Sequence, residues 1–431
     1  MDTATNTNKS HIIYNLFPRL IRTIDTWKEH LERIKRMQFN SIYINPFHKT
    51  GGSRSLYAVN DYYQLNSDFL PKGYNPSDFS ILKEFLSECK YSDIAVFMDL
   101  VINHTANDSV LIQEHPNWFK YQNGSIIHPY AIDPADPSHV TVWGDLSEIN
   151  YDNNPDFEGL RNYWDELIKF YQEIGFTGFR CDAAYKVPCS MWHPLINNAK
   201  QRNAETLFLA ESLGCTLQQV EALKGCGFDY MFNSSKWWNF DGSWCIDQHW
   251  QIKPIAPSIS FPESHDTPRV AANPPGTINW QKNRYLLASL FSQGLMMPIG
   301  FEYGATRALH VIDSCPEHLQ EKKWDLQTWI TEVNNLKSKN SCLRDEGQWL
   351  VLYGFDSDIL FLMKESNDRS NKVGLLVNKN WYNGTIVANF RIPEKIREMP
   401  NRIYPFNDPK ILLKNEGDIA VGPSEMVMFT N

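Results

Sequence analysis

The sequence predicts an α/β fold, a (β/α)8 TIM barrel, followed by an all-β sandwich domain. Short apolar runs alternate with amphipathic runs over roughly the first 345 residues, which is typical of parallel strands joined by helices. Eight apolar runs of this kind match the number of strands in the barrel. Beyond about residue 345 the pattern changes to short strands separated by turn residues, which indicates an antiparallel sandwich.

The first half of the barrel starts with HIIYNLF at 11–17, a continuous apolar run that predicts a strand. Four apolar residues at helical spacing predict the helix after it: Ile24, Trp27, Leu31 and Ile34. SIYINP at 41–46 and IAVFMDLVINH at 94–104 are the second and third predicted strands. A stretch rich in Pro and Asn then runs to about residue 155, which is too long for an ordinary loop between a strand and a helix.

The second half of the barrel is predicted from the same alternation. Five apolar residues at helical spacing form the face of the next helix: Leu160, Trp164, Leu167, Ile168 and Tyr171. Strands four to eight are predicted at 175–188, 206–212, 227–232, 258–266 and 295–304. The strands of the C-terminal sandwich are predicted in WLVLYGF, DILFLMK, KVGLLVN, TIVANFRI and SEMVMF.

Composition and charge exclude several classes of partner. The net charge of −9 argues against nucleic acid, because phosphates need basic surfaces. No segment approaches the ~20 apolar residues that span a bilayer, and the polar start MDTATNTNKS does not resemble a signal peptide. Eight cysteines without a C-x-x-C pair favour free thiols in a reducing compartment. We therefore expect a cytoplasmic protein with no nucleic-acid or membrane partner.

Aromatic residues make up 13% of the chain, including 14 tryptophans. Bulky core packing explains such a composition, and so does a groove of flat apolar platforms for the C–H faces of sugar rings. Composition alone does not decide between these two explanations.

Acidic residues follow three of the predicted strands. Asp182 ends strand four, Glu211 ends strand five and Asp266 ends strand seven. One acid at a strand end is more often a helix N-cap than a catalytic group. Three acids at the carboxyl ends of barrel strands converge on one mouth, which is where TIM-barrel enzymes carry their chemistry. Arg180 and His265 accompany two of these acids and join the candidate site.

Cleavage of a glycosidic bond needs this arrangement of acids. One carboxylate attacks the anomeric carbon, and a second acid protonates the leaving oxygen. A third carboxylate stabilises the positive charge of the transition state. Arg180 lies two residues before Asp182 on the same strand face, so its charge keeps Asp182 ionised as the nucleophile.

Four motifs resemble the alpha-amylase family of glycoside hydrolases over nearly the whole chain. They are DLVINH (99–104), GFRCDAAYK (178–186), LAES (209–212) and PESHDTPR (262–269). The resemblance implies that Asp182 is the nucleophile, Glu211 the general acid/base and Asp266 the transition-state stabiliser. The contacts it implies with substrate come from Tyr57, which stacks on the sugar, and from His104, Arg180 and His265.

The resemblance also implies a domain organisation. The catalytic barrel would comprise 1–104 and 151–345, interrupted by an inserted domain B at 105–150. Residues 346–431 would form the C-terminal β-sandwich domain.

Several positions depart from the usual pattern of the family. Tyr185 and Lys186 stand where many members have Lys-His, and Ser264 replaces the usual Asn. Lys186 is expected to contact the acceptor sugar, with a solvated lysine or the partner of an acid as the alternative. Asn103 matches a residue that often binds calcium, but the other oxygen ligands of such a site are not identifiable. No cofactor is expected to be required, and calcium at Asn103 stays open.

Within the family, the maltosyltransferase branch is the one that the chain resembles most. HPNWFKYQNGSI (115–126), SLYAVNDY (55–62) and MMPIGFEYG (296–304) carry this similarity. The maltose-1-phosphate enzymes of that branch hold phosphate with a domain B lysine, whereas 133–146 contains no Lys or Arg here. We therefore expect a retaining glycosidase or transglycosylase acting on α-1,4-linked glucans such as maltooligosaccharides, glycogen or starch. The alternatives are a maltose-1-phosphate-dependent maltosyltransferase and an inactive glucan-binding or interaction protein.

Overall fold

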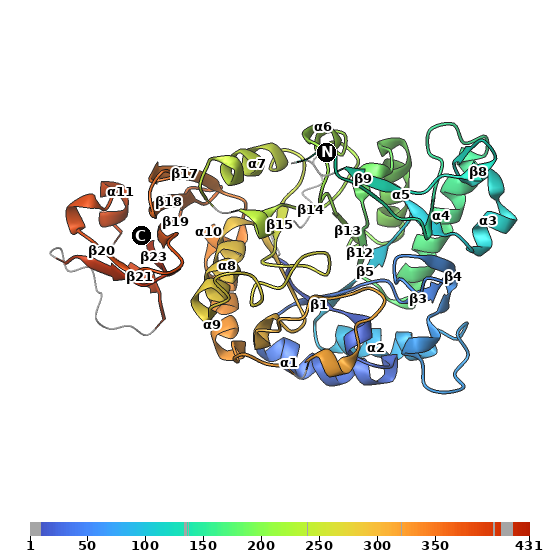
Figure 1. The fold of residues 1–431 in the computed structure, drawn as a ribbon, viewed down its shortest axis with the longest axis horizontal. Helices are drawn as coiled ribbons and strands as arrows, with labels where there is room; N and C mark the ends of the chain where they lie inside the picture. Colours follow the sequence, from blue (N-terminus) through green and yellow to red (C-terminus); the bar gives the residue numbers. More distant parts are fainter. Residues whose placement is uncertain are drawn as a thin grey trace. The chain divides into compact units, whose positions relative to one another are not determined.

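A computed structural model describes residues 10–132, 136, 138–238, 240–319, 321–399, 401–406 and 417–431 (Figure 1). It confirms the predicted parallel barrel, which is closed in the strand order β1-β16-β15-β14-β13-β12-β5-β2. The barrel strands are β1 (Ile12–Leu16), β2 (Ser41–Ile44), β5 (Ala95–Leu100), β12 (Gly178–Cys181), β13 (Leu207–Ala210), β14 (Tyr230–Phe232), β15 (Ser258–Ser260) and β16 (Gly294–Pro298).

All eight predicted barrel strands are present, but several are shorter than expected. The fourth was expected over 175–188, and β12 covers only Gly178–Cys181. The seventh was expected over 258–266, and β15 covers only Ser258–Ser260. In both cases the strand pairing ends and the polar residues that follow form a loop. These two loops carry Asp182 and Asp266.

The helices of the described residues are α1 (Leu31–Arg36), α2 (Ser80–Tyr91), α3 (Val110–Glu114), α4 (Phe157–Ile174), α5 (Cys189–Arg202), α6 (Leu217–Glu221), α7 (Trp244–Ile252), α8 (Ile278–Phe291), α9 (Gln327–Lys339), α10 (Ser341–Arg344) and α11 (Glu394–Arg397). The five residues that predicted α4 are all buried. Asp156 caps its first turn through Gly159 N at 3.2 Å, and Gly175 ends it at φ 125°. The first predicted helix is instead a 3-10 segment, η2 (Ile24–His30), continued by α1.

The chain divides into two compact units, which are described separately. One contains the described residues of Ile13–Phe232 and Leu309–Gln320, and the other those of Met1–Ile12, Asn233–Ala308 and Glu321–Asn431. In the first unit the neighbouring strands from β1 through β2, β5, β12 and β13 to β14 pair in parallel. Figure 1 shows α4 and α5 next to each other in this unit.

The irregular stretch after β5 contains short antiparallel pairs. β6 (His104–Ala106) pairs with β11 (Leu146–Glu148), β7 (Tyr121–Gln122) with β8 (Ser125–Ile126), and β9 (Tyr130–Ile132) with β10 (Val140–Val142). A further pair, β3 (His48–Thr50) with β4 (Val59–Leu65), follows β2. The boundaries 105–150 of an inserted domain stay a prediction, and 133–135 and 137 lie outside the described residues.

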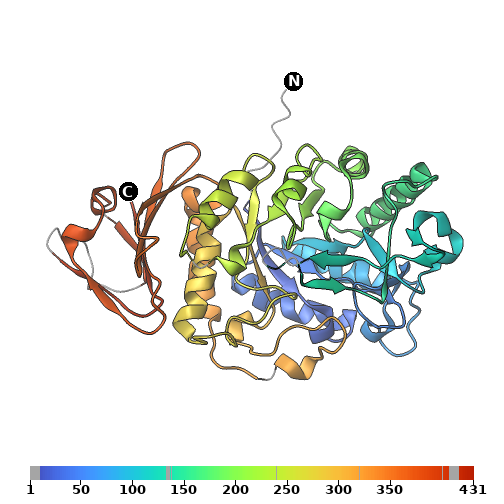
Figure 2. The ribbon, with the colours of Figure 1, turned by 45° about the horizontal axis from the view of Figure 1, so that its top comes forward.

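The C-terminal region has a five-stranded antiparallel sheet in the order β17-β18-β19-β23-β21. Its strands are β17 (Gln348–Tyr353), β18 (Ile359–Glu365), β19 (Lys372–Asn378), β21 (Asn401–Tyr404) and β23 (Met426–Thr430). A second pair, β20 (Thr385–Val387) with β22 (Ile419–Val421), packs on one face together with α11 through Ile396 (Figure 2). Strands β21 and β22 were not predicted, and TIVANFRI forms only β20 and a 3-10 turn at 389–391.

Candidate active site

Arg180 lies at the centre of the candidate site in the first unit. It lies opposite Asp99 in the register of β12 and β5, so its guanidinium reaches the Asp99 carboxylate at 2.8 and 3.1 Å. The same Nη1 donates to Asp182 Oδ1 at 2.6 Å. Arg180 Nη2 lies 3.6 Å from Glu211 Oε2. One buried guanidinium therefore contacts three carboxylates from the ends of three neighbouring strands.

Asp99 is a site residue that the sequence analysis did not single out. It is 1% exposed and accepts hydrogen bonds from Tyr43 Oη at 2.5 Å and Tyr57 Oη at 2.6 Å. Asn45 Nδ2 donates to both tyrosine hydroxyls at 3.0 Å. Burial raises the pKa of the Asp99 carboxyl, and the charge of Arg180 opposes this shift. An acid inside a buried strand needs a partner. The aspartate of DLVINH was therefore the feature of the sequence that could have identified Asp99 as a site residue.

Asp182 follows β12 and is held on several sides. Its backbone N–H donates to Leu100 O at 3.1 Å, which extends the strand pairing by one residue. Asn103 Nδ2 donates to Asp182 Oδ2 at 2.9 Å and to its backbone oxygen at 3.0 Å. Burial acts to raise the pKa of Asp182, but Arg180, His104 and the Asn103 hydrogen bond outweigh it and lower the pKa. The carboxyl is therefore ionised at neutral pH.

Glu211 follows β13 and faces the same guanidinium. Its backbone N–H donates to Cys181 O at 3.0 Å, so the residue still lies within the strand register. Oε2 accepts from the backbone N–H of Ala183 at 2.8 Å, and Oε1 accepts from Leu213 N. Ala183 has φ 40°, a left-handed conformation that turns the chain sharply after Asp182. A separation of about 5–5.5 Å between the Asp182 and Glu211 carboxyls, as retaining enzymes require, stays a prediction.

His104 and Tyr57 lie next to this cluster. His104 Nδ1 is 2.5 Å from Asn103 Oδ1, and its Nε2 is 3.2 Å from the backbone oxygen of Tyr57. Burial lowers the pKa of His104, against the nearby charge of Asp182. The Tyr57 hydroxyl is bound to Asp99, and the residue itself is partly exposed. These contacts fix both rings next to the cluster of Arg180 and its carboxylates.

Lys186 contacts Tyr130 on β9, and among the described residues it forms no salt bridge with an acid. Its Nζ donates to the backbone oxygen of Tyr130 on β9 at 3.0 Å and lies 5.2 Å from the centre of the Tyr130 ring. Burial lowers the pKa of Lys186, while Glu148 acts to raise it. The amine thus connects the loop after Asp182 to the β9–β10 pair. A role at the acceptor sugar stays a prediction.

His265 and Asp266 belong to the second unit, in the loop after β15. His265 Nε2 lies 3.0 Å from Asp266 Oδ2, and the Asp266 side chain is 55% exposed. The Asp266 backbone N–H donates to Ser264 Oγ at 3.2 Å, so the serine that replaces the usual asparagine shapes this turn. The convergence of Asp266 with Asp182 and Glu211 at one mouth stays a prediction.

Arg269 forms a structural ion pair in the same loop. Its Nη1 donates to Glu263 Oε1 at 2.7 Å, and both side chains are 1% exposed. Glu263 Oε2 also accepts from Val270 N at 2.6 Å, and Arg269 Nη2 donates to Ile299 O at 2.9 Å. These bonds tie the ends of the loop that carries Asp266 to the residues after β16.

We expect Glu263→Gln to lower the free energy of unfolding by about 3–5 kcal/mol, because it leaves the Arg269 charge buried without its partner. Urea unfolding followed by tryptophan fluorescence measures this loss. Glu84→Gln is the matched control, since Glu84 pairs with Lys28 at the surface and both side chains are about half exposed or more. A loss no larger than that of Glu84→Gln would show that the buried pair does not hold the loop.

The described residues show neither a metal cluster nor a membrane span. Within them, no group of three or more His, Cys, Asp or Glu side chains is placed to hold a metal ion. None of their helices combines the length and the apolar character needed to cross a membrane.

The sequence is similar to glucan-modifying enzymes. A family model described as "Glycogen debranching enzyme, glucanotransferase domain" matches residues 7–125. An alpha-1,4-glucan:maltose-1-phosphate maltosyltransferase of Burkholderia pseudomallei is 24% identical over 294 residues, which cover 66% of this chain and 25% of the relative. The enzyme of the same name from Picrophilus torridus is 24% identical over 363 residues, or 77% of this chain and 54% of the relative. The chain thus spans between a quarter and about half of these relatives.

Solved structures share the fold over nearly the full length. A trehalose-6-phosphate hydrolase of Bacillus licheniformis superposes with a TM-score of 0.77 at 13% identity, covering 98% of this chain and 99% of that one. An alpha-amylase of Lactobacillus plantarum superposes with a TM-score of 0.75 at 17% identity, covering 99% of each chain. At these identities the likeness concerns the fold.

Proposed function

We propose that this chain, a member of the alpha-amylase family with relatives in its maltosyltransferase branch, is a retaining glycosidase or transglycosylase acting on α-1,4-linked glucans. The observation that carries the proposal is the Arg180 guanidinium, which contacts Asp182 at 2.6 Å and Glu211 at 3.6 Å. An ionised nucleophile beside a second carboxyl is what the retaining mechanism needs.

In the first half-reaction, an Asp182 carboxylate oxygen attacks the anomeric carbon. The bond from that carbon to the glycosidic oxygen breaks, and Glu211 gives its proton to the leaving oxygen. The glycosyl unit is then bound covalently to Asp182. Because Asn103 and Arg180 hold the two Asp182 oxygens, the attacking group is already oriented before substrate enters.

In the second half-reaction, Glu211 acts as a base. It takes a proton from water or from a sugar hydroxyl, whose oxygen attacks the anomeric carbon and releases Asp182. Asp266 is proposed to stabilise the positive charge of both transition states. Tyr57 is proposed to stack on the sugar, and His104 and His265 to donate hydrogen bonds to its hydroxyls.

Lys186 is proposed to favour a sugar over water in the second half-reaction. Its amine donates to the backbone oxygen of Tyr130 in the β9–β10 pair. The amine and this strand pair would together form the part of the site that binds the acceptor sugar. We expect Lys186→Ala to lower transfer relative to hydrolysis and to affect formation of the glycosyl-enzyme less. Oligosaccharide products are compared with reducing-end release at high maltotriose. An unchanged ratio would assign Lys186 a purely structural contact.

One experiment distinguishes the proposed reaction from the alternative in which maltose 1-phosphate is the donor. The protein is incubated with maltoheptaose, with and without inorganic phosphate, and the products are identified by mass. We expect maltooligosaccharides of new lengths without phosphate. Release of maltose 1-phosphate only when phosphate is present would favour the phosphate-dependent enzyme, and no product in either arm would favour an inactive glucan-binding protein.

The remaining parts of the proposal concern cofactor and location. No cofactor is needed for the acid–base steps above, and the expected location is the cytoplasm, without nucleic-acid or membrane partners. Calcium at Asn103 remains part of the family resemblance only, because the Asn103 side chain already contacts Asp182 and His104. We expect activity to survive EDTA. A loss that calcium reverses would place a cation at Asn103.

A further inference from the structure

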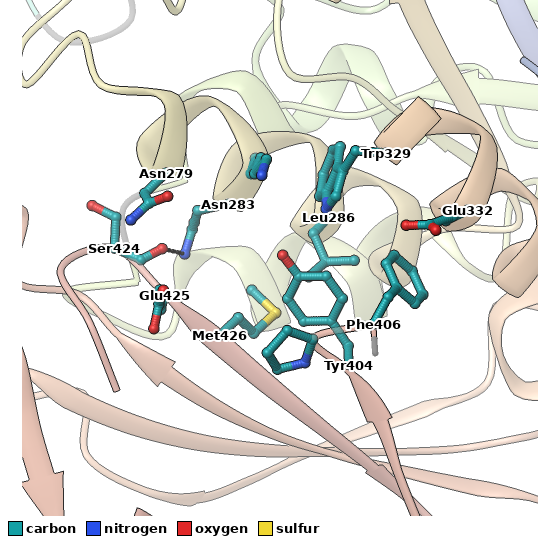
Figure 3. A pocket seen from close by; sticks show the side chains of 12 residues that line it. Asn279, Asn283, Leu286, Trp329, Glu332, Tyr404, Phe406, Ser424, Glu425 and Met426 are labelled. Atoms are coloured by element: carbon teal, nitrogen blue, oxygen red, sulfur yellow. Dashed lines mark hydrogen bonds between the residues drawn. The ribbon is translucent and has the colours of Figure 1, made fainter. Parts of the chain in front are cut away.

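The second unit contains a cavity of about 230 Å³ that none of the candidate active-site residues lines. Asn279, Lys282, Asn283 and Leu286 contribute one face of α8, since they recur three and four residues apart. The other walls come from α9, from the end of β21 and from the start of β23: Trp329, Glu332, Tyr404, Pro405, Phe406, Ser424, Glu425 and Met426. Figure 3 shows Tyr404 in the middle of this lining, with its hydroxyl directed toward α8.

The floor of the cavity is apolar and aromatic. Leu286 and Met426 are buried, at 1% and 2% exposed. The Tyr404 ring meets Phe406 edge to face, with centroids 5.1 Å apart, and lies 6.4 Å from the Trp329 ring. Rings and methylene groups of this kind pack against the C–H faces of a sugar.

The rim is polar and supplies both donors and acceptors. The Nζ of Lys282 lies 5.6 Å from the centre of the Trp329 ring. In the described part of the chain, neither Lys282 nor Glu332 forms a salt bridge. The Asn283 amide donates to the Ser424 backbone oxygen at 2.9 Å (Figure 3). Ser424 is 2% exposed, yet its hydroxyl has no hydrogen-bond partner among the described residues. A buried hydroxyl without a partner is uncommon, and this one adjoins the cavity wall.

The charge of the lining selects among ligand classes. One lysine faces two carboxylates, Glu332 and Glu425, so the lining is net negative and disfavours a phosphate or another anion. Two carboxylates on separate elements do not by themselves supply the six or more oxygens that a hard cation takes. A neutral ring that carries hydroxyls at its edge and C–H groups on its faces fits both the rim and the floor.

We propose that this cavity binds a single glucosyl unit of a long α-glucan without taking part in catalysis. The choice of glucan rests on the proposed function. The volume is below the roughly 300–1,000 Å³ of pockets that enclose drug-sized ligands, which suits one ring of a chain. Its role is to hold polymeric substrate, so it raises the apparent affinity for glycogen and not for maltotriose.

The test uses the double variant Lys282→Ala/Glu332→Ala, which keeps the net charge. Its matched control is Lys28→Ala/Glu84→Ala, which removes the same residue types from an exposed pair in the other unit. Each double variant is combined with Asp182→Asn, so that no turnover occurs, and its retardation is measured on native gels containing glycogen. We expect the pocket variant to bind glycogen roughly three- to tenfold more weakly, as the loss of one or two hydrogen bonds implies, and the control to match the parent.

Activity assays with Asp182 intact separate this proposal from the proposed function. The pocket variant should lose kcat/KM on glycogen and keep it on maltotriose. Equal retardation of the pocket variant and the control by glycogen would overturn the proposal that the cavity binds glucan, even where the parent is active. Loss of retardation in the pocket variant, with a parent inactive on every glucan, would support the pocket and refute the proposed function. A second variant, Tyr404→Phe, removes only one hydroxyl from the lining and should also weaken retardation by glycogen.

Discussion

Asp182→Asn and Glu211→Gln are each expected to lower kcat on maltoheptaose by at least about 10²–10⁴-fold, the range that one positioned acid–base group supplies. An amide at 182 cannot form the glycosyl-enzyme bond, and an amide at 211 cannot give a proton to the leaving oxygen. Both replacements keep side-chain volume and the hydrogen bonds from Asn103 and Ala183 that a carbonyl oxygen can accept. The fold should therefore survive.

The two variants should differ on an aryl maltoside whose leaving group needs no proton. Glu211→Gln should still form the covalent intermediate on this substrate and show a burst, whereas Asp182→Asn should show none. Glu205→Gln is the control, because Glu205 is an exposed acid six residues before Glu211. Turnover near that of the wild type in either variant would exclude the assigned roles.

Arg180→Leu is expected to reduce activity and stability together. Arg180 is buried and contacts Asp99, Asp182 and Glu211, so its removal leaves like charges without a partner. Breaking a buried ion pair from one side typically costs about 3–5 kcal/mol. Urea unfolding measures the loss, with Arg397→Leu on the exposed face of α11 as control. A loss of stability with unchanged kcat would leave Arg180 a structural residue only.

The pH dependence of the same variant tests how Arg180 acts on Asp182. In the wild type the pKa of Asp182 in the folded protein lies below the ordinary pKa of an aspartate. The ionised carboxylate therefore contributes its full stability at pH values above the ordinary pKa. This contribution is lost as the pH falls through the lower pKa of the folded protein. Without Arg180, burial raises the Asp182 pKa. The acid limb of kcat/KM should then move to higher pH in Arg180→Leu. Arg180→Lys should bring the acid limb part of the way back toward its wild-type pH, because lysine returns the positive charge but not the planar, bidentate guanidinium.

Much of the fold followed from the sequence. Buried parallel strands are continuous apolar runs, and this local property placed all eight barrel strands in order. The ends of these strands were less well predicted in GFTGFRCDAAYKVP, because apolar residues also follow Asp182, whereas the strand stops at Cys181. The strands β21 and β22 were missed because they are too short to show a period.

The sequence by itself determined which chemical groups the candidate site contains: an acid after β12, another after β13, an arginine two residues before the first, and the motifs around them. Only the tertiary structure decided how these groups are connected. The parallel register places Asp99 opposite Arg180. The hydroxyls of Tyr43 and Tyr57 then donate to Asp99, and Asn45 holds both hydroxyls. The tertiary structure also joins Lys186 to Tyr130 across 56 positions of the chain. The physical reason is that strand register and loop closure set which distant side chains meet, whereas local sequence sets only which face of the strand each one occupies.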